Sequence, residues 1–177
     1  MPPPLPSLKK EPALKVTPFS PNLAPTLLSW IDTEQTRRLW SGNTFESIPS
    51  PLEFLNHLSR TNLHPFAGID EEEDLAAYGE LVDDDKKAGI LCRVIVNPDK
   101  RRQGYGKTLC RELLRIGFGE LDYRNVTLNA FHSNLPALRC YESLGFRRIA
   151  FRPKAGKFRK DARDLVIMRK ERPLLRL

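Results

Sequence analysis

Apolar positions occur in short runs along much of the chain, and turn residues bound these runs. Leu14–Phe19 alternates between apolar and polar side chains, which is typical of a half-buried strand. Two further runs flank the polar segment 83–87 and predict a β-hairpin. The segments that predict strands are Leu14–Phe19, Phe66–Ile69, Leu75–Val82, Gly89–Val96, Val126–Phe131, Phe146–Phe151 and Leu165–Arg169.

Other segments carry helical spacing and capping residues. Asp32 is in position to cap one helix that Gly42 ends, and Ser50 followed by Pro51 begins another. Asn134 is the expected N-cap of the last helix, and Gly145 follows its end. The predicted helices are Leu23–Trp30, Asp32–Leu39, Leu52–Leu58, Gly104–Phe118 and Leu135–Leu144. We therefore expect one α/β domain over residues 13–172, preceded by a flexible Pro-rich tail over residues 1–12.

Composition narrows the class of protein. Apolar residues make up 40% of the 177 residues and charged residues 29%, which favours a globular domain over a disordered chain. No apolar run approaches the roughly 18 residues that span a bilayer, and prolines stand where a signal peptide has its apolar core. Three well-separated cysteines do not form a disulfide framework or a zinc site. We expect a cytoplasmic protein without a metal or a membrane partner.

The net charge of +7 is unevenly distributed along the sequence. Residues 1–100 carry 10 Lys and Arg against 15 Asp and Glu, whereas residues 101–177 carry 19 against 7. A basic half indicates a polyanionic ligand, either nucleic acid or a phosphorylated cofactor. An acidic half suits a cationic substrate such as an amine.

A Gly-rich turn between a strand and a helix is the first chemical motif. The segment Arg101–Gly106 has the sequence RRQGYG, and Lys107 follows it. At such a turn the first helical N–H groups lack partners, and glycines allow a ligand to approach the backbone closely. The segment is neither a P-loop nor a complete dinucleotide fingerprint. It is a candidate pyrophosphate site, with a purely geometric turn as the alternative.

Two motifs together resemble the Gcn5-related N-acetyltransferase superfamily. The first reads V-x-V-x-P and then R-x-x-G-x-G from Val94 to Gly106, and the second is N-x-x-A-x-x-x-Y-x-x-x-G-F from Asn134 to Phe146. The resemblance is strong over Arg93–Phe146, extends over Leu14–Arg169 and is absent from the tail. It implies an α/β fold whose mixed, mostly antiparallel central sheet splays at the cofactor site and is flanked by helices.

The resemblance also implies a donor substrate, acetyl-CoA, and roles for particular residues. The backbone of Val94, Ile95 and Val96 would pair with the pantetheine arm, and Asn134 would bind pantetheine while capping its own helix. Tyr141 would act as general acid toward the CoA sulfur, with a core tyrosine as the alternative. The implied pyrophosphate-binding residues are Arg101, Arg102, Gln103, Gly104, Tyr105, Gly106 and Lys107.

The general base is not given by the motifs. Members of this superfamily that acetylate ribosomal proteins place a Glu five residues before the motif Asn, but this chain has Asn129 there. Glu80 is the preferred substitute, acting directly or through water, and the alternative is a solvated carboxylate near a strand end. His132 has a suitable ordinary pKa but is expected to be a loop residue.

The acceptor side is expected in residues 23–66. The large aromatic residues there are expected in the core, whereas the segment 40–45 is a polar loop edged by aromatics that suits an amine-bearing ligand. The acidic run 71–74 is either a solvated turn or an attraction for a cation. The expected acceptor is an amine of a small molecule or peptide.

Two other classes of function compete with an N-acetyltransferase. One is an inactive acyl-CoA-binding sensor or partner subunit, because Asn129 replaces the Glu. The other is a nucleic-acid-binding protein using the basic loop 147–160, which no recognised nucleic-acid motif supports. A homodimer is a further expectation, since dimers are common in the superfamily.

Overall fold

One open sheet organises the part of the chain that the computed structural model describes, residues 10–153 and 164–174. Its strand order is β1-β2-β3-β4-β5-β7-β6, and every neighbouring pair is antiparallel except β4 with β5. The strands are β1 Lys15–Pro18, β2 Leu63–Ile69, β3 Leu75–Asp84, β4 Ala88–Val96, β5 Asn125–Phe131, β6 Arg147–Arg152 and β7 Leu165–Glu171. This mixed, mostly antiparallel sheet confirms the predicted fold class.

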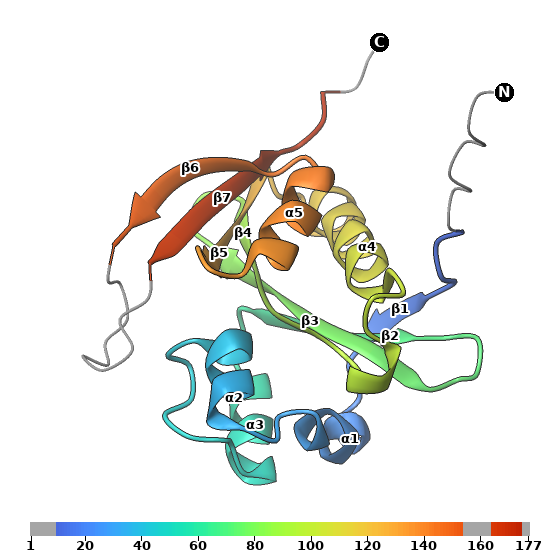
Figure 1. Ribbon diagram of the computed structural model, residues 1–177. Coiled ribbons are helices and arrows are strands. Elements are labelled where there is room, and N and C mark those ends of the chain that lie inside the picture. The colour runs from blue at the N-terminus through green and yellow to red at the C-terminus, as the bar shows by residue number, and fades with distance from the viewer. Residues whose placement is uncertain (1–9, 154–163, 175–177) are drawn as a thin grey trace, which may run out of the picture.

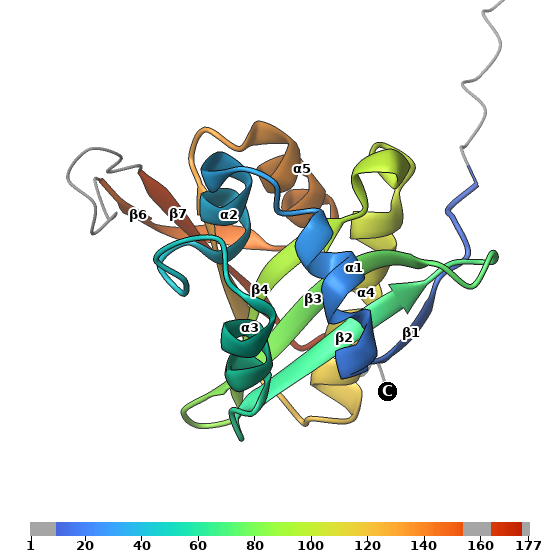
Figure 2. The same ribbon diagram turned by 90° about the horizontal axis from the view of Figure 1, so that it is seen from below.

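Helices cover both faces of the sheet (Figures 1 and 2). The first three lie on one face, and α4 and α5 lie on the other. The helices are α1 Ala24–Ser29, α2 Glu34–Ser41, α3 Pro51–Leu58, α4 Tyr105–Gly119 and α5 Leu135–Ser143, with short 3-10 turns at Pro21–Leu23 and Pro98–Lys100. All the predicted helices are therefore present.

The two faces of the sheet carry separate hydrophobic cores. Under α4 and α5, residues such as Leu113, Val126 and Leu138 are fully buried. Under the first three helices, Leu27 and Phe54 are fully buried. The aromatic residues predicted to be core, including Trp30, Trp40 and Phe45, belong to this second core. Strands β3 and β4 contribute side chains to both cores.

Helix capping follows the sequence signals with one correction. Ser50 and Glu53 form a full capping box at α3, and Gly42 ends α2 with φ +54°. The N-cap of α2 is Thr33 and not Asp32, because the Thr33 hydroxyl accepts the N–H of Thr36 at 3.1 Å. Strand β2 also begins at Leu63, three residues before the predicted start.

The sheet opens between β4 and β5. These parallel strands pair only from Ala88 to Ile90 on β4, opposite Asn125 to Thr127 on β5. Beyond that point β5 keeps its pairing with β7, while β4 keeps only β3. The edge of β4 from Cys92 to Val96 is therefore unpaired on the side of β5, which confirms the predicted splay.

A β-bulge lies on β4 next to this opening. Tyr78 is paired with Ile95 and Glu80 with Cys92, so Arg93 and Val94 both lie opposite Gly79. Arg93 has φ +50°, a left-handed conformation that costs a non-glycine residue on the order of 1–3 kcal/mol. Surrounding contacts must therefore hold Arg93 in place.

The end of the predicted tail contacts the domain. Glu11 forms an ion pair with Arg111 on α4, and a Cβ built on Gly104 would lie 3.1 Å from Pro12. Residues 1–9 and residues 154–163, which include half of the predicted basic loop 147–160, lie outside the described residues, and residues 147–152 of that loop form strand β6. No helix in the described part of the chain has the length and apolar character needed to cross a membrane.

Candidate active site

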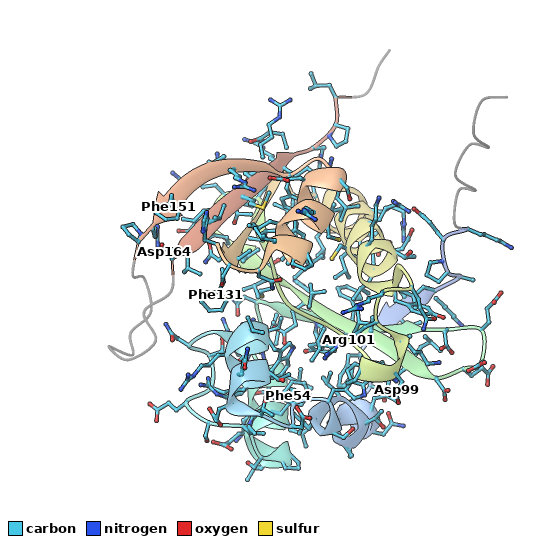
Figure 3. The ribbon with its side chains drawn as sticks, in the orientation of Figure 1. Phe54, Asp99, Arg101, Phe131, Phe151 and Asp164 are labelled. Atoms are coloured by element: carbon cyan, nitrogen blue, oxygen red, sulfur yellow. The ribbon has the colours of Figure 1, made fainter. Side chains whose placement is uncertain are left out.

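A cavity of about 1130 Å³ occupies the opening between β4 and β5. Its walls come from α2 and the turn after it, from β4, from the loop before α4, and from α5. Arg101 and Phe131, both labelled in Figure 3, line it from the loop before α4 and from the end of β5. The predicted motifs thus meet around one cavity.

The loop before α4 presents unpaired amides to this cavity. The first hydrogen bond of the helix runs from the N–H of Thr108 to the carbonyl of Gly104 at 3.0 Å. The N–H groups of Tyr105, Gly106 and Lys107 precede it and have no intrahelical acceptor. Gly104 has φ +94°, a conformation that glycine adopts without strain. We call residues 101–107 the phosphate loop.

Most side chains predicted for the phosphate loop line the cavity, with one exception. Arg101 and Arg102 are exposed at the rim, and Gly106 packs so closely that an added Cβ would lie 3.2 Å from Val96. Gln103 instead faces a smaller cavity beside residues 10–12, and its side chain donates to the carbonyl of Asp99 at 3.5 Å. The predicted part of Gln103 in the phosphate loop therefore falls to its backbone amide and not to its side chain.

The unpaired edge of β4 forms the floor of the cavity. Val94, Ile95 and Val96 all line it, and their pairing partners lie only on the β3 side. The N–H and C=O groups on the other side of this edge are available to an extended ligand, as they would be to an added strand.

Helix α5 and its N-cap place two predicted side chains, Asn134 and Tyr141, in the lining of the cavity. The side-chain oxygen of Asn134 accepts the N–H of Ala137 at 3.4 Å, so the cap role is occupied while Asn134 also lines the cavity. Tyr141 is half-buried and its ring packs edge-on against Phe146 at 5.9 Å between centroids. Its hydroxyl has no hydrogen-bond partner among the described residues, and burial raises its pKa well above the ordinary range. The phenol therefore stays protonated at working pH.

Glu80 lies in a buried cluster behind the cavity wall. Its exposed fraction is 0%, and it forms an ion pair with Arg93. His57 Nε2 lies 3.0 and 3.2 Å from the two carboxylate oxygens, and the Tyr78 hydroxyl donates to one of them at 2.6 Å. The alternative of a solvated strand-end carboxylate was wrong, because Glu80 is in the middle of β3. We call Glu80, Arg93, His57 and Tyr78 the buried cluster.

The buried cluster holds the bulge of β4 in place. The Arg93 carbonyl accepts the indole N–H of Trp40 at 2.9 Å, and the Arg93 guanidinium donates to the Thr44 hydroxyl at 2.9 Å. Burial opposes the charge of Arg93, but the neighbouring Glu80 carboxylate raises its pKa overall. These contacts tie the left-handed residue to α2, to the following turn and to β3.

A second buried arginine shapes the wall of the cavity that α2 and the following turn form. Arg37 has an exposed fraction of 1% and donates to the carbonyl of Gly42 at 3.2 Å and to that of Phe45. Its Nε also donates to Glu34 at 2.8 Å. The turn 42–45 is therefore held from inside, and residues 40–44, most of the segment singled out from the sequence, line the cavity.

Comparison with known proteins identifies the family. Residues 27–146 match the model of the Acetyltransferase (GNAT) family, which is more than half of the chain. The chain belongs to the acetyltransferase (GNAT) family.

Individual relatives of this GNAT chain are distant. It is 26% identical over 119 residues to the SPbeta prophage-derived uncharacterized N-acetyltransferase YokL of Bacillus subtilis (strain 168), covering 67% of each chain. Among solved structures, spermidine N-acetyltransferase from Vibrio cholerae in complex with CoA and spermine superposes with a TM-score of 0.77 at 18% identity, covering 89% of this chain and 95% of that one. The spermidine/spermine N-acetyltransferase from Vibrio cholerae in complex with manganese ions gives a TM-score of 0.72 at 17% identity, covering 89% and 92%. These similarities confirm the fold.

The predicted acidic run and the alternative base His132 lie outside the cavity lining of this GNAT domain. The acidic turn after β2 does not line the cavity, and Asp70, Glu72 and Asp74 instead surround the ammonium of Lys100. His132 is exposed and contacts Phe151 edge-on, with 5.5 Å between ring centroids. The sequence does not show that His57 and Arg93 are buried beside Glu80, so sequence analysis gives these two residues no role. His57 reaches Glu80 from 23 positions away, and no local sequence pattern indicates that contact.

Proposed function

We propose that this GNAT protein is an N-acetyltransferase that moves the acetyl group of acetyl-CoA to the amine of a small molecule or peptide. One observation carries the proposal: the open amides of the phosphate loop, the unpaired edge of β4 and the phenol of Tyr141 line a single cavity. The residues fit acetyl-CoA part by part. The anion-binding amides of the phosphate loop suit its diphosphate, and the unpaired edge of β4 suits its pantetheine arm. The protonated phenol suits its thioester.

Binding is assigned to backbone groups more than to side chains. The amides of residues 102–107 would hold the diphosphate, aided by the charges of Arg101, Arg102 and Lys107. The edge from Val94 to Val96 would pair with the pantetheine arm, and Asn134 would donate its amide N–H to the same arm. Such pairing would fix the thioester next to the bulge of β4.

The chemistry needs a neutral amine, a donor for the developing negative charge and a proton for the leaving sulfur. Acetyl-CoA supplies the activated acyl group. A backbone N–H of β4 beyond the bulge would stabilise charge on the thioester oxygen, and the Tyr141 hydroxyl would give its proton to the sulfur. Holding the two reactants in line accounts for much of the expected acceleration.

Glu80 has a positioning role in this proposal. Its carboxylate is fully buried, does not line the cavity and already accepts from Arg93 and Tyr78. It would act on the reaction by fixing Arg93 and hence the bulge, in place of the role predicted from the sequence, a general base acting directly or through water. The described lining of the cavity contains no Asp, Glu or His side chain. The amine would therefore enter neutral or lose its proton to water.

The first test is calorimetric titration with acetyl-CoA, with NAD as a control, followed by measurement of CoA release with a panel of amines. We expect binding in the micromolar range for acetyl-CoA and none for NAD. Gly106→Val should weaken binding at least about tenfold, because its side chain would fill the space between the loop and Val96. Gly119→Val, where an added Cβ meets nothing within 4 Å, is the matched control.

The outcomes separate the candidate functions. Equal binding by the Gly106→Val protein and the wild type would contradict the phosphate loop. Tight acetyl-CoA binding without CoA release for any amine would favour the sensor or partner-subunit alternative. Salt-dependent retention of RNA without acetyl-CoA binding would favour the nucleic-acid alternative.

A further inference from the structure

The charged side chains in the described lining of the cavity are all basic. Its described lining contains eight Lys and Arg residues and no Asp or Glu. A cofactor with three phosphate groups explains Arg101, Arg102 and Lys107 of the phosphate loop at one end, and the neighbouring Lys100 is already paired with Asp70. Such a cofactor does not explain the other end of the cavity, because pantetheine and the thioester carry no charge.

The acceptor end has its own basic groups. Arg38 on α2, Arg60 after α3 and Arg93 on β4 all line the cavity there. The charge of Arg93 is balanced by the buried carboxylate of Glu80. Arg60 is exposed and forms no ion pair with any carboxylate among the described residues. Of Arg60 and Arg93, Arg60 is therefore the residue whose charge is available to bind a ligand.

Arg60 and Cys92 line the same cavity, and the charge of Arg60 acts on the Cys92 thiol. Burial raises the pKa of the Cys92 thiol to about 12, and the charges of Arg93 and Arg60 hold it lower than burial alone would. Cys92 precedes the bulge and lines the same cavity. Arg60 and Arg93 therefore both act on a thiol in the wall of this cavity.

Several carboxylates of the N-terminal half are engaged away from Arg60. Asp70, Glu72 and Asp74 surround Lys100, and Glu80 lies behind the cavity wall. A polycationic acceptor would bring a like charge to Arg60, with no carboxylate in the described lining to receive it. Like-charge contact of this kind is a common means of rejecting a ligand.

We infer that the acceptor is a small amine that also carries an anionic group, a carboxylate or a phosphate ester, which Arg60 binds while the amine faces β4. This inference rests on the proposed function and names the substrate class of the same cavity. It separates this protein from its structural neighbour, which was solved in complex with spermine. Arg60 is thus a specificity-determining residue.

The experiment compares four linear acceptors that share one primary amine and differ in their second group. These are 5-aminopentanoate, 3-aminopropyl phosphate, 5-aminopentanol and 1,5-diaminopentane. Each is titrated calorimetrically into the full chain saturated with CoA, so the affinities are obtained without turnover. CoA release from acetyl-CoA is then measured for the same four compounds.

We expect one or both anionic amines to bind at least about tenfold more tightly than the diamine, with the amino alcohol between them. The stronger of the carboxylate and the phosphate identifies the anionic group. Arg60→Glu should reduce or reverse the preference, whereas Arg60→Lys should keep it. Arg124→Glu makes the same change of charge at an exposed residue that does not line the cavity, and should leave the preference unchanged.

Three results would overturn the inference: equal affinity for all four compounds, tightest binding of the diamine, or no detectable binding of either anionic amine to a protein that binds CoA. Equal loss of preference in the Arg60→Glu and Arg124→Glu proteins would overturn the assignment to Arg60. Failure to bind CoA at all is a different result, because it contradicts the proposed function itself.

Discussion

At the scale of single residues, Tyr141 is the group whose surroundings match its proposed task most directly. It lines the cavity, lacks a hydrogen-bond partner among the described residues and has a raised pKa because it is buried. Since the raised pKa keeps the phenol protonated, Tyr141 should not lose its proton within the pH range in which the enzyme is assayed.

Tyr141→Phe should lower kcat by about 10²-fold and leave the affinity for acetyl-CoA unchanged, because only the hydroxyl is removed. The measurement is steady-state kinetics together with calorimetry. Tyr105→Phe, which removes a hydroxyl from the phosphate loop, serves as the comparison variant. Wild-type kcat in the Tyr141→Phe protein would remove Tyr141 as the general acid.

Glu80→Gln tests a positioning role against a role as base. Loss of the carboxylate leaves the Arg93 charge buried without its partner, and breaking such a pair costs about 3–5 kcal/mol. We expect a lower melting temperature and a lower kcat, while the pH dependence of kcat/KM keeps its midpoint.

The pH midpoint is the readout that separates the two roles of Glu80. If the basic limb of the profile disappears in Glu80→Gln, Glu80 takes the proton and the positioning role is wrong. The double variant Glu80→Gln with Arg93→Gln provides the control, because a neutral pair should recover part of the lost stability.

The residue scale is also where the sequence was least informative. Motif spacing indicated Tyr141, Asn134 and the phosphate loop, because each of them belongs to a motif of residues that are close in the sequence. It could not indicate that His57 approaches Glu80 across 23 positions, or that Arg93 adopts a left-handed conformation. Those features arise from pairing across the sheet, which no local pattern contains.

At the scale of elements, most of the fold was predictable because each element carries its own signals. Glycines, prolines and capping residues marked the helix ends, and the hairpin between β3 and β4 followed from a polar turn between apolar runs. The errors were local: Thr33 was a better cap than Asp32, and β2 extends toward His64 and Pro65, which a hydrophobicity pattern does not favour. The order of strands across the sheet depends on contacts between distant segments, which such signals do not specify.

At the scale of the whole molecule, an ion-pair group joins distant parts of the chain. Asp122, which precedes β5, contacts Lys87 in the β3–β4 turn and Arg172 after β7. Lys87 and Arg172 lower the pKa of Asp122 from its ordinary value of 3.8 to about 2. A carboxyl whose pKa falls on folding stabilises the native state above its unfolded pKa, and this contribution disappears as the pH falls through the folded pKa.

Asp122→Asn should therefore lower the melting temperature at pH 7, and the difference from wild type should shrink between about pH 4 and pH 2. Thermal unfolding followed by circular dichroism at pH 7 and across that range measures it. Asp85→Asn, in the same β3–β4 turn as Lys87 but without an ion pair among the described residues, should have little effect at either pH. A constant difference between pH 7 and pH 2 would show that the ion pairs of Asp122 do not act through its charge.

The two cores on opposite faces of the sheet have a consequence for how such a protein can diverge. The first three helices rest on one core, and α5 and the helix α4 that follows the phosphate loop rest on the other. Substitutions that remodel the first three helices can accumulate in a lineage while the donor side remains intact. Under the proposed function, new acceptors could thus be acquired without loss of acetyl-CoA binding. The bulge at Arg93 is an exception, because it is joined to Trp40 and Thr44 on one side and continues into the β4 edge on the other. A mutation there would be under selection for both substrates at once.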